Sequence, residues 1–322
     1  MIQRRAPRSA SDAAGRPARG EDWATPIASG RGHAGARRRL AMLALVAAAS
    51  LWGTSFLFGK VALRELGPAD LTLLRFALAT LALLPVALVQ RVYPRRRDLP
   101  LFALTGVLTV PATFLVQFAG LQRTSASIAA LIVGSNAPLI AVAARLFLGE
   151  RLGRPGWVAV GLSSLGVALT VSQPGAGNDW TGDALVFLSM LAVVGWVLLG
   201  RRLTRDYAPV AATAYIIGFG TLATLPLALL LEGPPRVALS AGAWVSVAML
   251  GLGCSAGALA LWNWGQRGVP AGSASIYLNL EPLVGALLGV LILGQGLSPL
   301  AALGGALIIG AAVLVSCQRA YA

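Results

Sequence analysis

Glu281 has the strongest case for chemistry, because it lies within a long apolar run and directly precedes Pro282. An ionisable group inside a lipid-spanning helix is costly and tends to face a cavity or a partner. The proline frees a backbone carbonyl one turn earlier, near Leu278, and opens the helix locally. Two interpretations follow. The carboxyl carries a coupling proton or pairs with an amine, or it is a hydrogen-bonded brace for the proline kink.

Arg75 lies in a second apolar run and offers a forked, permanently charged donor. A guanidinium of this kind binds a carboxylate through two parallel hydrogen bonds, so Arg75 is a candidate for a substrate carboxylate. Two alternatives stay open. The side chain can extend toward the membrane surface, or it can pair with Asp70 or Glu65.

Aromatic and amide side chains inside the apolar runs complete a possible pocket. Glu281 and Tyr277 are four residues apart and share a helix face, whereas Asn279 points elsewhere. Pro138 repeats the pattern of a polar residue shortly before a proline, which makes Pro138 and Pro282 candidate helix kinks. Interhelical packing and hydrogen bonding are the alternative for each residue. The candidate substrate-binding residues are Trp52, Arg75, Gln117, Asn136, Trp196, Tyr215, Tyr277, Asn279 and Glu281.

Other residues with chemical potential are interpreted structurally. Cys254 and Cys317 lie in apolar runs, so they are expected to pack rather than to bind metal. Arg145 and Glu150 are expected to form a clamp at the membrane surface. Trp262 and its neighbour Trp264 are expected to belong to an interfacial aromatic belt.

Metal, cofactor and enzyme motifs are missing from the sequence. The one histidine, His33, lies in the N-terminal tail, so no histidine-based triad or metal site can be assembled. No glycine-lysine phosphate loop is present, which argues against transport driven by this chain's own ATP hydrolysis. We therefore expect no cofactor, no metal and no enzymatic activity.

The composition places this chemistry in a membrane. The chain has 322 residues, 57% hydrophobic and 12% charged, whereas a soluble domain carries about 25% charged residues. The expected fold is an all-α integral membrane protein, since a span needs about 20 apolar residues. The predicted spans are 40–60, 70–90, 99–119, 125–148, 155–173, 183–200, 209–231, 239–263, 271–293 and 297–317.

The chain repeats itself. Residues 121–139 resemble residues 265–283 at a separation of 144, and residues 68–85 resemble 209–226 at a separation of 141. Trp52 and Trp196 are again 144 apart. The predicted domains are a basic disordered cytoplasmic tail (1–39), a first five-helix repeat (40–173), a linker (174–182), a second five-helix repeat (183–317) and a cytoplasmic C-terminus (318–322).

Arginine asymmetry predicts the orientation. With the N-terminus inside, eleven Lys or Arg residues fall in cytoplasmic connections and four fall outside, which favours cytoplasmic termini at both ends. Five helices per half is an odd number, so the two halves enter the membrane from opposite faces. Such inverted repeats support alternating access to a central site. The nine arginines before Leu40 are expected to lie against anionic lipids rather than nucleic acid.

Several stretches together resemble the EamA repeat of the drug/metabolite transporter superfamily. They are LWGTSF at 51–56, RF at 75–76, GLQRTSAS at 120–127, LGERL at 148–152 and SASIYLNLEP at 273–282. The resemblance implies ten helices in two inverted units and export of small metabolites, often amino acids. One departure is visible, because residues 293–295 read LGQ where the family has LGE.

The expected function is a secondary exporter of amino acids, aromatic or amphipathic ones included, or of their derivatives, in a bacterial-type inner membrane. An uncoupled facilitative permease and a drug or amine exporter are the alternatives on the same scaffold. An intramembrane enzyme or a scaffold is disfavoured by the missing catalytic residues. The sequence leaves the oligomeric state open, a monomer included.

Overall fold

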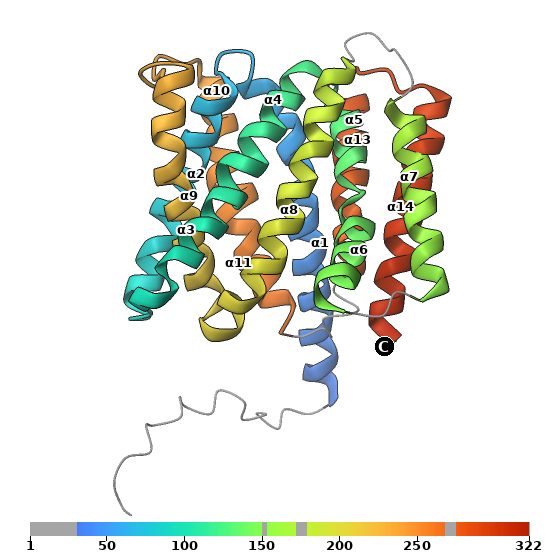
Figure 1. The fold of residues 1–322 in the computed structure, drawn as a ribbon, viewed down its shortest axis with the longest axis horizontal. Helices are drawn as coiled ribbons and strands as arrows, with labels where there is room; N and C mark the ends of the chain where they lie inside the picture. Colours follow the sequence, from blue (N-terminus) through green and yellow to red (C-terminus); the bar gives the residue numbers. More distant parts are fainter. Residues whose placement is uncertain (1–30, 150–152, 172–178, 268–274, 322) are drawn as a thin grey trace, which may run out of the picture.

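The computed structural model describes residues 31–149, 153–171, 179–267 and 275–321. Within these ranges the chain is helical, with turns and short connections and no strand. The helices stand roughly side by side in one bundle, and most span its height (Figure 1). The all-helical prediction is therefore confirmed for the described part of the chain.

The helices of the first half follow the predicted spans. They are α1 (Arg31–Ala62), α2 (Pro68–Val89), the short η1 (Arg96–Asp98), α3 (Leu99–Val107), the π-helix η2 (Leu108–Leu115), α4 (Val116–Arg123), α5 (Ala126–Val133), α6 (Asn136–Leu148) and α7 (Arg154–Val171). Elements α3, η2 and α4 form one continuous rod, whereas α5 and α6 are separated by a break at Gly134 and Ser135.

The second half is built in the same way. Its elements are α8 (Trp180–Asp206), α9 (Pro209–Leu231), α10 (Ala241–Ala248), the π-helix η3 (Met249–Gly257), α11 (Ala258–Gly265), the 3₁₀-helix η4 (Ser275–Asn279), α13 (Leu280–Leu291) and α14 (Pro299–Tyr321). Helix α9 matches the predicted span 209–231 residue for residue.

Length and composition identify seven candidate membrane spans among the described residues, and Tyr277–Leu291 and Pro299–Leu314 are shorter apolar helices. This is the pattern of a multi-pass membrane protein. One boundary needs correction. Helix α1 begins at Arg31, although the sequence predicts a disordered tail up to residue 39. Residues 31–39 are rich in Ala and Arg, which favour helix and extend the apolar span beyond the lipid. Residues 1–30 lie outside the described part.

The π-helices occupy matching places in the two halves. In η2 the Thr113 hydroxyl donates to the Leu108 carbonyl (2.7 Å), and in η3 the Ser255 hydroxyl donates to the Leu250 carbonyl (2.9 Å). Each hydroxyl thus bonds five residues back, as the wider π turn requires. Only η2 contains a proline, so proline alone does not cause the π turn. Such insertions are frequent at functional sites.

Helices α2 and α9, which match in the sequence repeat, lie side by side and run antiparallel (Figure 1). The Glu232 carboxylate, just after α9, accepts from the backbone N–H groups of Ala69 and Asp70 at the start of α2 (2.8 and 2.9 Å). Near the middle, the Thr80 and Thr221 hydroxyl oxygens are 3.3 Å apart. Since these threonines are equivalent in the repeat, they mark a local two-fold axis.

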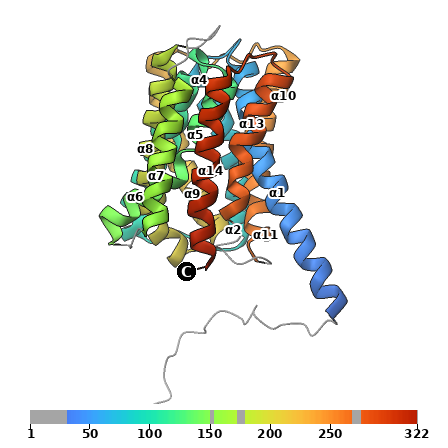
Figure 2. The ribbon, with the colours of Figure 1, turned by 90° about the vertical axis from the view of Figure 1, so that its right-hand side faces the viewer.

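Glycines allow close helix crossings. A Cβ on Gly106 of α3 would lie 2.6 Å from the Ile216 carbonyl of α9, and a Cβ on Gly220 would lie 2.5 Å from the Gly106 carbonyl. Helices α7 and α14 stand side by side in both views (Figures 1 and 2) and cross at Gly166 and Gly304 in the same way. These crossings hold the bundle together through backbone contact.

We expect Gly220→Ala to destabilise the protein by about 1–3 kcal/mol, the usual cost of overpacking. The added methyl would clash with Val110 of η2 and with the Gly106 carbonyl of α3, so α9 would have to move away from both elements. Thermal unfolding in detergent measures the change. Gly161→Ala is the matched control, because nothing lies within 4 Å of a Cβ there. Wild-type unfolding of Gly220→Ala would show that the crossing is looser than described.

Candidate functional site

Helix geometry changes just before both candidate kink prolines. Helix α5 ends at Val133 and α6 begins at Asn136, two residues before Pro138. In the second half, η4 ends at Asn279 and α13 begins one residue before Glu281. Each break places a polar side chain, Asn136 or Glu281, in the first turn of the following helix.

Arg75 of α2 lies inside the bundle with only 3% of its surface exposed. Its Nε donates to the Ser255 hydroxyl of η3 at 3.0 Å. The guanidinium carbon lies 4.5 Å from the ring centre of Phe114, with Phe76 and Phe118 also within cation–π range at 5.1 and 5.6 Å. The aromatic rings surround the guanidinium group, and its terminal nitrogens make no hydrogen bond to described residues.

The other two readings of Arg75 are wrong. Its burial excludes extension to the membrane surface. Asp70 instead accepts from the backbone N–H of Arg236 (3.2 Å), and Glu65 accepts from the backbone N–H and hydroxyl of Ser240 (2.8 and 2.5 Å). Those hydrogen bonds hold the pKa of the Glu65 carboxyl below its usual range. Both carboxylates therefore bind the connection between α9 and α10, and Glu65 does so at the N-cap of α10.

Glu281 is half-buried and interacts electrostatically with Arg75. The two groups do not form an ion pair within 4.0 Å, since the ion pairs of the described chain are Arg97–Asp98 and Arg123–Asp179. Helix α1 presses against this region, because a Cβ on Gly53 would lie 2.7 Å from the Glu281 carbonyl. The polar centre is thus assembled from α1, α2, η3 and α13.

Cys254 adds a polar contact that the sequence did not suggest. Its thiol lies 3.4 Å from the Thr54 hydroxyl of α1, next to Ser255, the partner of Arg75. The side chain is buried, as a packing role predicts, but it also links η3 to α1. Ser255 and Thr54 were missed because hydroxyls are common in membrane helices and carry no signal of their own.

Trp52 packs against Trp262 with ring centres 5.3 Å apart and ring planes tilted by 47°. Trp262 also packs near Ala41 and Leu45, at the start of the predicted first span, where Tyr277 packs as well. Trp264 is 43% exposed. The interfacial belt expected for these two tryptophans stays a prediction.

Three further candidates carry polar atoms inside the bundle. The Nε1 of Trp196 and the Oδ1 of Asn136 are buried without a hydrogen-bond partner in the described part of the chain. Gln117 of α4 is 8% exposed. Buried polar groups are normally hydrogen-bonded, so atoms of this kind are available to a bound molecule or to water.

Tyr215 makes a structural hydrogen bond, whereas Asn279 precedes α13 without capping it through its side chain. The Tyr215 hydroxyl donates to the Val92 carbonyl (2.8 Å), which fixes α9 to the connection after α2. Asn279 is 9% exposed and stands at the N-cap of α13. Arg145 is exposed, and its expected partner Glu150 lies outside the described residues. Arg75 and Glu281 therefore lie within electrostatic range of each other without direct contact, whereas Tyr215 has another task.

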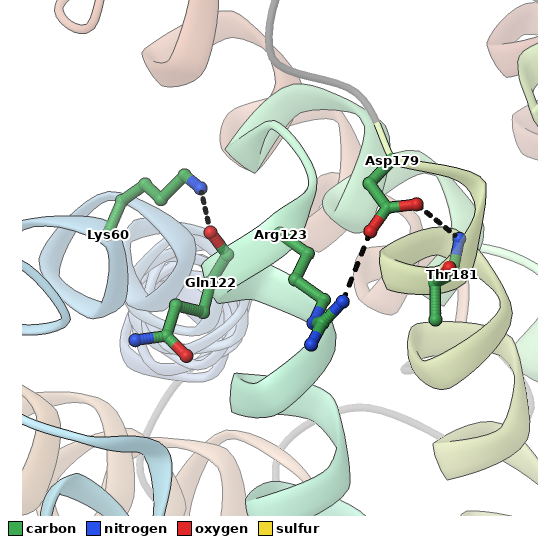
Figure 3. A network of polar contacts seen from close by, with 5 residues as sticks. All are labelled: Lys60, Gln122, Arg123, Asp179 and Thr181. Atoms are coloured by element: carbon green, nitrogen blue, oxygen red, sulfur yellow. Dashed lines mark hydrogen bonds and ion pairs between the residues drawn. The ribbon is translucent and has the colours of Figure 1, made fainter.

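At the end of the bundle where α1 and α4 finish, polar contacts join helix ends (Figure 3). The Lys60 ammonium donates to the Leu121 and Gln122 carbonyls (2.7 and 3.2 Å). Arg123 lies 3.4 Å from Asp179, which also caps α8 by accepting from the Thr181 N–H. That backbone hydrogen bond, with Arg123 adding to it, lowers the pKa of Asp179.

We expect Glu232→Ala to lower the free energy of unfolding by about 1–2 kcal/mol, because it removes the acceptor for the first N–H groups of α2. Glu232→Gln should lose about half as much, since one amide oxygen still accepts a hydrogen bond. Thermal unfolding of the three purified proteins in the same detergent should rank the wild type above Glu232→Gln and Glu232→Gln above Glu232→Ala. An alanine variant as stable as the wild type would contradict the capping role.

A family model described as the EamA-like transporter family matches residues 39–172 and 180–317. A protein of Streptantibioticus cattleyicolor named "Probable terminal-alkyne amino-acid exporter" is 29% identical over 86% of this chain and 93% of its own. A transporter of Archaeoglobus fulgidus is 27% identical over 84% of this chain and 94% of its own.

One further transporter and one solved structure are also similar to this chain. The inner membrane transporter YedA of Escherichia coli K12 is 26% identical over 86% of this chain and 90% of its own. A solved crystal structure with 21% sequence identity covers 91% of this chain and 99% of that chain, with a TM-score of 0.60. The structural likeness shows a shared fold.

Proposed function

Because the chain belongs to the EamA-like transporter family, we propose that it is a secondary exporter of small metabolites, with amino acids or their derivatives as substrates. The polar centre formed by Arg75 and Glu281 carries this proposal. The substrate class is supported by the printed name of the Streptantibioticus relative. The family and the relatives are transporters rather than enzymes.

The proposed architecture is ten membrane passes in two inverted repeats, 40–173 and 183–317, with both termini in the cytoplasm. The antiparallel pairing of α2 with α9 and the matching π-helices support the inversion. The two family matches, 39–172 and 180–317, support the boundaries. Arginine asymmetry supports the orientation in an inner membrane, with the basic tail against anionic lipids.

Arg75 is proposed to bind the substrate carboxylate. Its stacked guanidinium is held in one plane, and the terminal nitrogens remain free for a two-pronged contact. The unpaired polar atoms of Trp196 and Asn136 offer further contacts to a polar or aromatic substrate. Because Arg75 is only 3% exposed, a substrate reaches it only when the helices move, as alternating access requires.

Glu281 is proposed to carry a proton that is exchanged for substrate. A carboxyl group beside a fixed cation can hold either a proton or a negative charge, and a bound carboxylate at Arg75 would shift that balance. Competition of this kind couples the two fluxes. Without it, the same scaffold would act as an uncoupled permease.

Counterflow in proteoliposomes tests the function. Liposomes loaded with one unlabelled amino acid should accumulate the labelled form, and a pH gradient should alter the extent. Exchange without any pH response would favour the permease. If neither amino acids nor their derivatives exchange, the substrate proposal is wrong, and exchange of amines or drugs instead would favour that alternative.

A further inference from the structure

We propose that a cavity at the α1–α4–α13 end of the bundle is a vestibule that binds the carboxylate of a small metabolite. The cavity has a volume of about 280 Å³ and is lined by Lys60, Leu63, Arg64, Gln122, Leu293 and Gln295. It is distinct from the Arg75 centre, and none of its lining residues contacts Arg75. That the bound carboxylate belongs to a transported substrate rests on the proposed function, whereas anion binding itself does not.

The lining carries two cations and no carboxylate. The Lys60 ammonium donates to the Leu121 and Gln122 carbonyls at the end of α4, which fixes its position and leaves one N–H available. Figure 3 shows the contact with Gln122. Arg64 is exposed, and neither cation forms an ion pair within the described residues. Glu65, the residue after Arg64, instead binds Ser240, and Asp179 binds Arg123.

Gln295 explains why this charge remains uncompensated. Residues 148–150 of the first half read LGE, and the matching residues 293–295 read LGQ. The Gln295 side-chain oxygen accepts from the Ser127 N–H at the start of α5 (3.3 Å), a task that a glutamate would also perform. A glutamate here would place a negative charge in the cavity with Lys60 and Arg64. The amide keeps the hydrogen bond and leaves the cavity positive.

The positive field at Gln122 comes from Lys60 and Arg64, because Arg123, the next residue, pairs with Asp179. At the repeat separation of 144, Gln122 and Arg123 correspond to Gln266 and Arg267, so position 266 is a matched control outside the cavity. A field of this kind raises the local concentration of oppositely charged small molecules.

Charged thiol reagents test the field directly. In full-length protein with Cys254→Ala and Cys317→Ala, purified in detergent, Gln122→Cys and its repeat counterpart Gln266→Cys are each treated with anionic sulfonatoethyl and cationic trimethylammonioethyl methanethiosulfonate. We expect Lys60→Gln combined with Arg64→Gln to lower the anionic-to-cationic rate ratio about tenfold at position 122 and to leave it unchanged at position 266. An unchanged ratio at position 122 would overturn the proposal. Leu293→Cys, in the same lining, replaces Gln122→Cys if that variant does not fold.

Gln295→Glu tests the effect of adding one negative charge to the cavity. It should lower the ratio at position 122 about fivefold and leave position 266 unchanged, because the new carboxylate neutralises one cation. Benzoate should slow labelling at position 122, whereas benzylamine at the same concentration should not. An unaffected ratio in Gln295→Glu, or equal effects of the two probes, contradicts the vestibule. These readouts do not depend on transport, so a failed counterflow assay would leave them standing.

Discussion

Replacing Arg75 with glutamine is expected to reduce counterflow of a carboxylate substrate by about 100-fold, the effect of losing a buried two-pronged charged contact. The guanidinium is stacked on Phe114 and bonded to Ser255, so glutamine can reproduce neither its charge nor its plane. The measurement is the initial rate of labelled substrate uptake into preloaded proteoliposomes.

Two variants separate binding from folding. Arg75→Lys keeps the charge but loses the planar fork, and it should retain about a tenth of the wild-type rate. Arg236→Gln removes an exposed arginine whose described contact is made by its backbone, and it should transport normally. Each protein is first compared by size-exclusion chromatography. Wild-type counterflow by a well-folded Arg75→Gln would remove Arg75 from the substrate site.

Replacing Glu281 with glutamine is expected to abolish the response to a pH gradient while exchange continues. One exchanged proton allows a gradient of one pH unit to sustain about a tenfold substrate gradient, since one unit is worth about 1.4 kcal/mol. Glutamine cannot release a proton, so the sustained ratio should fall to about one. Steady-state accumulation with and without the pH gradient gives this ratio.

A purely structural role for Glu281 predicts the opposite result. If Glu281 only braces the break before Pro282, glutamine keeps the shape and much of the hydrogen bonding, and the pH response stays as in the wild type. A loss of thermal stability with a retained pH response would support the brace. The two interpretations that the sequence leaves open are thereby separated by one variant.

The helices were predictable because apolar length and the stops between spans are local properties. Pro68 and Pro209 lie at the start of α2 and α9, and the positive φ angles of Gly149 and Gly294 follow α6 and α13. The start of α1 was missed because charge and low apolar content suggested a tail, while helix propensity favoured continuation.

The site was predictable only in part. A charged residue inside an apolar run, such as Arg75 or Glu281, is recognisable in the sequence as a candidate site residue. Its partners come from distant segments and are not recognisable in this way. Ser255 is 180 residues from Arg75, and the π turn that presents it has no sequence signature. The contact between Trp52 and Trp262 likewise joins segments that are far apart in the sequence. Tertiary packing decides these contacts, and a single sequence does not display it.

The central claim is that two related halves cross the membrane in opposite senses around the Arg75–Glu281 centre. Reporter fusions after Glu65, in the connection following α1, and after Tyr207, in the connection following α8, test it most directly. Alkaline phosphatase should be active at the first position and inactive at the second, with green fluorescent protein giving the reverse pattern. Both connections in the same compartment would contradict the inverted arrangement and the export cycle built on it.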